Sequence, residues 1–323
     1  MNEAFYLTHL RFTLRPRGEI RLPRLNKGIT LRGAFGEELR RLVCSQGQGF
    51  CGTCPVSSHC QYAAIFCPRV PEDSKRLRLN RDLPRPFVIK PPSCGKERYE
   101  RDEPLSFDLV LVGRSVDLFP YVVLSFHALG DRGIGTGRGR FDIWAIEALD
   151  ASGECETLMK AGDPVVNFPQ KVIRFSDLAA SPPSTLRVDF LTPVLLRHEN
   201  QWSRPAFGIL MRRLRDRLNA LSYFYCGEAL NMDFQSFGLQ ADRDVKVIAE
   251  DLDWVEEFRP SKSQSVDHRL KGWVGHVIYQ GEFKEFWPYL WIGQYVHVGK
   301  AAAFGQGWYK VTAADYENRP PTS

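Results

Sequence analysis

Five of the eight cysteines fall within one stretch of 24 residues: Cys44, Cys51, Cys54, Cys60 and Cys67. Cys51 and Cys54 have the Cys-x2-Cys spacing at which two thiolates bind one metal ion, and Cys44 and Cys60 can complete a tetrahedral site. Cys67 is spare, and His59 is a substitute ligand. Because this segment has too few apolar residues to order itself, we predict a structural zinc ion. Four thiolates also suit an iron–sulfur cluster, and reduced cysteines without a metal are the third interpretation.

Four thiolate ligands leave no open coordination position for water or substrate, so the predicted metal has no catalytic role. The first ten residues alternate in polarity and form no signal-peptide core, which argues against the disulfides of a secreted protein. Cys94, Cys155 and Cys226 are isolated in the sequence and are interpreted as ordinary thiols.

A second motif that could bind a ligand is the glycine-rich run at residues 130–140. Its glycines allow the backbone to approach a ligand closely, and Arg132, Arg138 and Arg140 add guanidinium groups that pair with phosphates. The run precedes an expected strand at 141–149, whereas a dinucleotide-binding loop follows a strand and opens a helix, so a Rossmann site is excluded. The alternative is that the glycines only let a helix pack tightly against a sheet.

A similar run occurs near the C-terminus, with these candidate RNA-binding residues: His297, Gly299, Lys300, Gly305 and Gly307. Lys300 occupies the position that Arg132 has in the first run. Charge supports a polyanionic ligand, because residues 1–101 contain 19 Lys and Arg against 9 Asp and Glu, although the whole chain carries only +5. Basic groups bind phosphates with release of counterions, and two such loops on a basic chain favour RNA.

Hydrophobic periodicity predicts a similar order of strands and helices in both halves of the chain, with one more strand in the second half. The first half has strands at 5–14, 105–112 and 141–149 and helices at 30–43, with Thr30 as its N-cap, and 118–129. The second half has strands at 186–191, 245–248, 273–279 and 308–311 and helices at 205–225, capped by Ser203, and 283–291.

An ungapped offset of 168 residues pairs glycines, prolines and aromatic residues of the two halves, for example Pro120 with Pro288 and Gly139 with Gly307. Glycine and proline fix backbone geometry, so these pairs indicate a duplication. We therefore predict an α+β protein of two ferredoxin-like, RRM-like units. The expected domains are 1–150, with a Cys-rich insertion at about 44–100, and 185–323, joined by a linker at 151–184. With 43% hydrophobic residues the chain is not disordered, and apolar runs too short for a bilayer predict a soluble, cytoplasmic protein without a membrane partner.

The C-terminal motifs at 274–281, 286–290, 297–300 and 304–307 resemble the RAMP-superfamily endoribonucleases that mature CRISPR precursor RNA, the Cas-six family. Further similarity lies at 31–36, with the cysteines after it, at 85–89 and in the first glycine loop. The resemblance implies tandem RAMP domains and RNA held by the glycine loops. It also implies metal-independent cleavage, in which a 2′-OH attacks the adjacent phosphate to give a 2′,3′-cyclic phosphate and a 5′-OH.

Two functional interpretations follow from this resemblance. The first is an endoribonuclease that cleaves CRISPR repeat RNA into mature crRNA. The second is a non-catalytic subunit that holds crRNA among other proteins of a CRISPR effector complex. Both require the same folds, loops and charge.

The reaction needs a base, an acid and a cation near the phosphate. Family members commonly carry a catalytic histidine on or just after the first helix, but residues 30–43 contain none. Among the seven histidines, His9 and His276 lie in expected strands and His127 in an apolar helix, where an imidazole packed in the core is expected. His59 lies in the cysteine segment, His198 precedes the long helix without an obvious partner, and His297 is interpreted as an RNA contact. His268 remains, in a polar segment with Arg259 and Lys262, and these three are the predicted catalytic residues.

Overall fold

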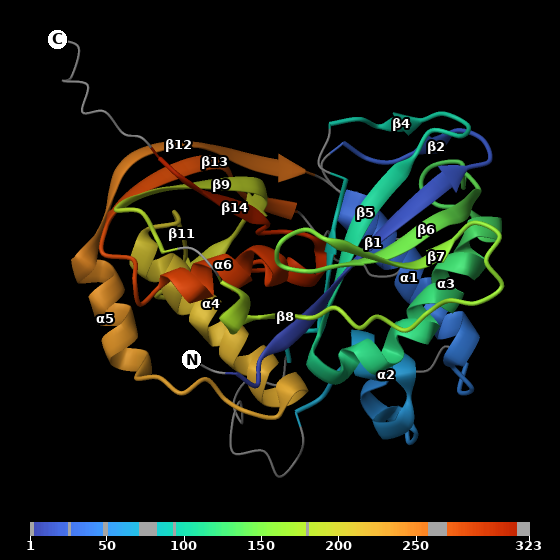
Figure 1. Cartoon of the computed structure of the whole chain (residues 1–323), viewed down its shortest axis with the longest axis horizontal. Coiled ribbons are helices and arrows are strands. Elements are labelled where there is room, and N and C mark those ends of the chain that lie inside the picture. The colour runs from blue at the N-terminus through green and yellow to red at the C-terminus, as the bar shows by residue number, and fades with distance from the viewer. Residues whose placement is uncertain are drawn as a thin grey trace. The chain divides into compact units, whose positions relative to one another are not determined.

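The computed structural model describes residues 3–24, 27–47, 51–70, 83–92, 95–178, 181–257 and 270–314 (Figure 1). The helices are α1 (Lys27–Val43), α2 (Gln61–Phe66), α3 (Phe119–Arg132), α4 (Phe207–Leu221), α5 (Phe234–Asp244) and α6 (Trp287–Val296). The chain forms two compact units. The first contains residues 1–177, 219–230 and 303–305, and the second contains the rest.

The first unit is built on an antiparallel sheet with the strand order β3-β5-β1-β6-β7. Its strands are β1 (Tyr6–Pro16), β3 (Phe87–Lys90), β5 (Leu105–Val112), β6 (Phe141–Leu149) and β7 (Cys155–Lys160). The short strands β2 (Ile20–Arg21) and β4 (Arg98–Tyr99) pair with each other, and β8 (Ile173–Arg174) pairs with β1. In chain order, β1-α1-β3-β5-α3-β6 is the ferredoxin-like arrangement, as expected from the sequence.

Helices α1 and α3 lie against one face of this sheet (Figure 1). Leu31, Phe35 and Leu39 recur every four residues along α1 and are all buried, because this spacing keeps them on one side of the helix. Phe35 stacks on Phe126 of α3 with ring centroids 5.3 Å apart. Thr30 was expected to cap α1, but the helix begins three residues earlier, at Lys27. Ile29 is also buried and extends the buried side of the helix toward its N-terminus.

The second unit repeats this plan with the strand order β12-β13-β9-β14. Its strands are β9 (Thr185–Val194), β10 (Leu196–His198), β11 (Gln201–Ser203), β12 (Val245–Glu257), β13 (Leu270–Gly281) and β14 (Tyr309–Ala313). In chain order, β9-α4-β12-β13-α6-β14 matches the first unit element by element. Pro120 and Pro288 both lie in the first turn of their helices, α3 and α6, which confirms the predicted duplication.

Some elements differ from the sequence expectation. Ser203 ends β11 and does not cap α4, which begins at Phe207. Helix α5 was not predicted, although Asp233 caps it by accepting hydrogen bonds from the amides of Gln235 and Ser236. The stretch expected to be a linker contains β7 and β8, and its residues up to 177 pack with the first unit. No helix among the described residues has the length and apolar content needed to cross a membrane.

Candidate nucleic-acid interface and cysteine lobe

The first glycine loop connects α3 to β6 within the first unit. A Cβ atom on Gly139 would lie 2.4 Å from the carbonyl oxygen of Glu19, so this glycine is required for close packing of two backbone segments. Gly137, at φ +82°, has open space where its Cβ would be. The loop therefore combines tightly packed glycines with an open tip at Gly137.

The three arginines predicted to bind RNA in this loop are all exposed. Arg132 is already engaged, because its Nε lies 3.1 Å from a carboxylate oxygen of Glu38, whose side chain is only 2% exposed. Arg138 and Arg140 have no ion-pair partner among the described residues. Two of the three guanidinium groups are thus available to an external phosphate.

In the second glycine run, the predicted RNA contact His297 is completely buried. Its ring stacks on Trp308 with centroids 6.0 Å apart, and Nδ1 donates a hydrogen bond to the carbonyl oxygen of Gln306 at 3.2 Å. The imidazole therefore holds this loop together inside the second unit. We do not carry His297 into the candidate RNA surface, because a buried ring offers no contact to a ligand.

The glycines of the second run are also used for packing. Gly307 has φ +65°, and a Cβ there would lie 1.8 Å from the carbonyl oxygen of Val298. Gly299 and Gly305 are similarly close to carbonyl oxygens of Leu195 and Ile89. These contacts agree with the alternative interpretation of the sequence, in which the glycines permit tight packing.

Lys300 is exposed and forms part of a patch that sequence reasoning missed. Its Nζ lies 5.4 Å from the ring centre of Trp202, and the guanidinium carbon of Arg197 lies 6.0 Å from the same ring. Trp202 is 43% exposed and lies on the β10–β11 hairpin. We call Arg197, Trp202 and Lys300 the tryptophan patch. Nucleic-acid bases stack on solvent-exposed aromatic rings, and neighbouring cations bind the phosphates.

The predicted catalytic residues His268, Lys262 and Arg259 lie outside the described residues. Of the other histidines, His9 and His276 lie in β1 and β13 as expected. His127 was expected in the core but is exposed on α3, because it lies on the side of the helix facing away from the sheet.

His9, Arg11 and Asp108 form a charged cluster in the first unit. They alternate along β1 and β5 with the core residues that face α1 and α3, so the cluster lies on the opposite face of the sheet. His9 Nε2 and Arg11 Nε lie 2.9 and 2.8 Å from the two carboxylate oxygens of Asp108. Burial acts to raise the pKa of Asp108, but the hydrogen bonds from His9 and Arg11 outweigh it and hold the pKa below its usual range. Burial lowers the pKa of the nearby Lys90 to about 8. The pairing of His9 with Asp108 agrees with a structural role for this histidine.

The cysteine segment forms a small lobe of the first unit, built from a 3-10 turn at Cys51–Thr53, another at Ser57–His59, and α2. Phe66 of α2 packs against Phe35 and Phe87 and anchors the lobe to the core. Neither 3-10 turn contains a buried residue, as the polar composition predicted.

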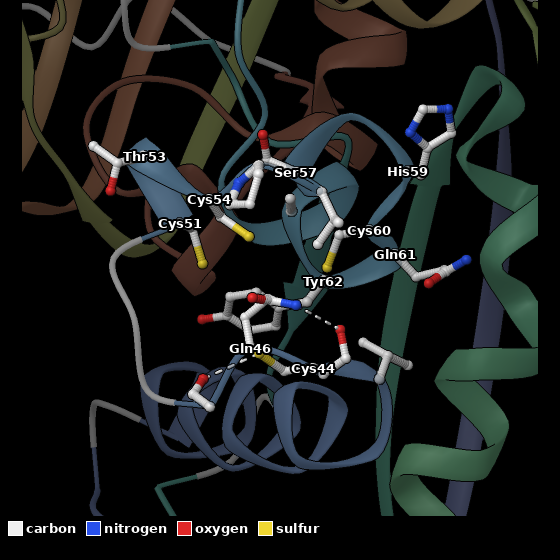
Figure 2. A pocket seen from close by; sticks show the side chains of 16 residues that line it. Cys44, Gln46, Cys51, Thr53, Cys54, Ser57, His59, Cys60, Gln61 and Tyr62 are labelled. Atoms are coloured by element: carbon white, nitrogen blue, oxygen red, sulfur yellow. Dashed lines mark hydrogen bonds between the residues drawn. The ribbon is translucent and has the colours of Figure 1, made fainter.

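The four cysteines predicted to bind metal, Cys44, Cys51, Cys54 and Cys60, all line one cavity of about 360 Å³ (Figure 2). Cys67 does not line this cavity but contacts the Cys51 side chain. Among the described residues, no three His, Cys, Asp or Glu side chains already have the mutual distances of a metal site. The structure therefore brings the four predicted ligands to one cavity without gathering their sulfur atoms at one point.

Each of two parts of the chain matches a known protein-family model. Residues 5–171 match the family model AF_1859_N, described as an N-terminal domain, and residues 188–309 match the model of the CRISPR-associated endoribonuclease Cas6. An uncharacterized protein of Archaeoglobus fulgidus is 30% identical over 108 residues, which cover 33% of this chain and 35% of that protein. The match thus spans about a third of this relative.

Solved structures agree in fold. The product complex of a Cas6 from Thermus thermophilus has a TM-score of 0.56 at 14% identity, covering 95% of this chain and all of that one. A second Cas6 product complex gives 0.52 at 17% identity over 95% and 100%. A partial Cas6-RT-Cas1–Cas2 complex gives 0.55 at 14% identity over 99% of this chain and 48% of that chain. The chain thus consists of two ferredoxin-like units, of which the first matches the AF_1859_N family and the second matches the family of the CRISPR-associated endoribonuclease Cas6.

Proposed function

We propose that the protein cleaves CRISPR repeat RNA to mature crRNA by attack of a 2′-OH on the adjacent phosphate, without a catalytic metal ion. The match of residues 188–309 to the Cas6 endoribonuclease model carries this proposal. It is supported by the exposed arginines of the first glycine loop and by the tryptophan patch. The proposed ligand is single-stranded or hairpin RNA, because phosphates suit the arginines and an unstacked base suits Trp202.

The proposed reaction transfers protons at two positions. A base takes the proton of the 2′-OH as its oxygen bonds to phosphorus, and an acid protonates the 5′-oxygen as its bond to phosphorus breaks. We assign the base to His268, and the stabilisation of the extra phosphorane charge to Arg259 and Lys262, because this histidine lies close to both cations in the sequence. The products are a 2′,3′-cyclic phosphate and a 5′-OH.

The decisive experiment incubates the full chain with end-labelled repeat RNA in excess EDTA. Cleavage at one position that leaves a cyclic phosphate supports the proposal. A set of RNAs, each with one 2′-deoxy nucleotide, is the matched control, because the substrate lacking the attacking hydroxyl must stay intact. Tight binding without products would instead support the crRNA-holding subunit. Cleavage that needs added Mg²⁺ would contradict the metal-independent mechanism.

The proposed partners include other CRISPR-associated proteins as well as RNA. The Cas6-RT-Cas1–Cas2 complex contains a chain whose fold matches 99% of this one. Co-purification of the full chain with CRISPR-associated proteins from its own host would support such an assembly, and a monomer eluting alone with crRNA would contradict it.

Removing the two available guanidinium groups of the first glycine loop should weaken RNA binding. We expect Arg138→Ala combined with Arg140→Ala to make the slope of log affinity against log salt shallower by about 1.4 to 1.8, since each arginine neutralises one phosphate. Filter binding at several salt concentrations measures this slope. The control is Arg114→Ala with Lys160→Ala, which removes equal charge from exposed positions of the same unit outside the glycine loop. A slope in the Arg138→Ala, Arg140→Ala variant equal to that of the parent would mean that the loop has no phosphate contacts.

The tryptophan patch should contribute through stacking. We expect Trp202→Ala to lower RNA affinity by about 10-fold, within the range of roughly 1–3 kcal/mol for one stacked base. Trp202→Phe should retain most of the affinity, because a phenyl ring still stacks. Trp254, which is 41% exposed in the same unit, gives the matched alanine control. If Trp254→Ala and Trp202→Ala weaken binding equally, the patch is not the specific contact.

A further inference from the structure

We propose that Cys44, Cys51, Cys54 and Cys60 bind one zinc ion that fastens the cysteine lobe to the end of α1. The four side chains line the same cavity. Cys51, Cys54 and Cys60 approach it from the lobe, and Cys44 lies across the cavity, directly after the last residue of α1 (Figure 2). A single ion bound by all four thiolates would therefore link two separate elements.

The part of the lobe that carries Cys51 and Cys54 has little packing of its own among the described residues. Its two 3-10 turns bury no residue, and their backbone hydrogen bonds, such as Cys54 N to Cys51 O at 3.4 Å and Ser57 N to Cys54 O at 3.2 Å, are long. Apolar anchoring comes from α2, which follows the four cysteines in the chain. Metal binding supplies the missing ordering free energy in small loops of this kind.

Hydrogen bonds fix the position of Cys44 at the end of α1. The backbone amide of Cys44 donates to Arg40 O at 2.9 Å and so continues the helix, and its thiol donates to Gly47 O at 3.1 Å. The ion would have to draw the thiols of the lobe toward Cys44, because the sulfur atoms of the described residues are not yet at metal-binding distances. Zinc binding is then coupled to closure of the lobe onto the helix.

The surrounding charges suit an anionic centre. Four thiolates around Zn²⁺ leave a net negative charge, which needs nearby cations or hydrogen-bond donors when it is partly buried. The Arg40 guanidinium lies beside the Cys44 side chain, and Arg69 donates from Nη2 to the backbone carbonyl of Cys51. Both guanidinium groups thus lie beside proposed ligands.

The ligand set is the argument for zinc. Both polar and apolar side chains line the cavity with the cysteines, among them Ser45, Gln46, Val43 and Val56. Four cysteines that include a Cys-x2-Cys pair are typical of a structural zinc site.

Cys67 provides a matched control for the ligand assignment. It lies in the same lobe and contacts the side chain of Cys51, but it does not line the cavity. Replacing it removes one thiol from the lobe and leaves all four proposed ligands in place.

The test measures metal content in the purified full chain and in Cys44→Ser, Cys54→Ser and Cys67→Ser. We expect about one zinc per chain in the parent and in Cys67→Ser, and nearly none in the other two. X-ray absorption should place four sulfur atoms at about 2.3 Å from the zinc. In the parent, Co²⁺ substitution gives a thiolate charge-transfer band whose intensity reports the number of sulfur ligands, so the proposal is testable even if a variant fails to fold.

Three results would overturn the proposal. The first is a folded parent chain without stoichiometric metal after anaerobic purification. The second is iron with labile sulfide and visible absorption, which would replace zinc by a cluster. The third is loss of metal in Cys67→Ser equal to that in Cys54→Ser, which would change the ligand set. None of these readouts depends on RNA cleavage.

Discussion

His268→Ala is expected to slow cleavage of repeat RNA by about 10²-fold or more, the scale of lost general acid–base catalysis. RNA affinity should stay nearly unchanged, because the imidazole is assigned to proton transfer and not to binding. Single-turnover cleavage with saturating protein measures the chemical step, and filter binding with uncleavable 2′-deoxy RNA measures affinity.

The control for this variant is His127→Ala, which removes an exposed histidine on α3 of the first unit. Arg259→Ala and Lys262→Ala should also slow the chemical step, since they would stabilise charge on the phosphorane. If the parent cleaves and His268→Ala matches it, catalysis depends on Arg, Lys or Tyr groups that position the 2′-OH, and the histidine-centred mechanism is wrong.

Gly307→Ala is expected to destabilise the second unit by about 3 kcal/mol or more, because a left-handed backbone and a backbone clash act together. The residue has φ +65°, and the new Cβ would lie 1.8 Å from Val298 O. Thermal unfolding followed by circular dichroism measures the loss as a lower midpoint temperature for the second unit.

Gly137→Ala separates conformational strain from the clash. Its φ is +82° but its Cβ would meet open space, so we expect a cost of only roughly 1–2 kcal/mol to the first unit. The packing explanation for Gly307 would be contradicted if Gly307→Ala kept the parental stability and lost only RNA affinity. The backbone at Gly307 would then be a ligand contact.

The sequence alone predicted the ferredoxin-like class and most elements of each unit, although it missed β3, β7 and α5. The periodic Leu31, Phe35 and Leu39 predicted α1, and alternation predicted β5 and β6 with the bounds that they have. The offset between Pro120 and Pro288 predicted that one plan occurs twice. These features are local, because a hydrophobic period or a proline in a first turn acts through neighbouring residues.

The availability of each candidate residue was decided by tertiary structure. Arg132 and Arg138 look equivalent in the sequence, but only Arg132 meets the buried carboxylate of Glu38. His297 and Lys300 are three residues apart, yet the first is buried on Trp308 and the second is exposed beside Trp202. Burial and pairing depend on residues distant in the chain, so neither motif nor spacing reveals them.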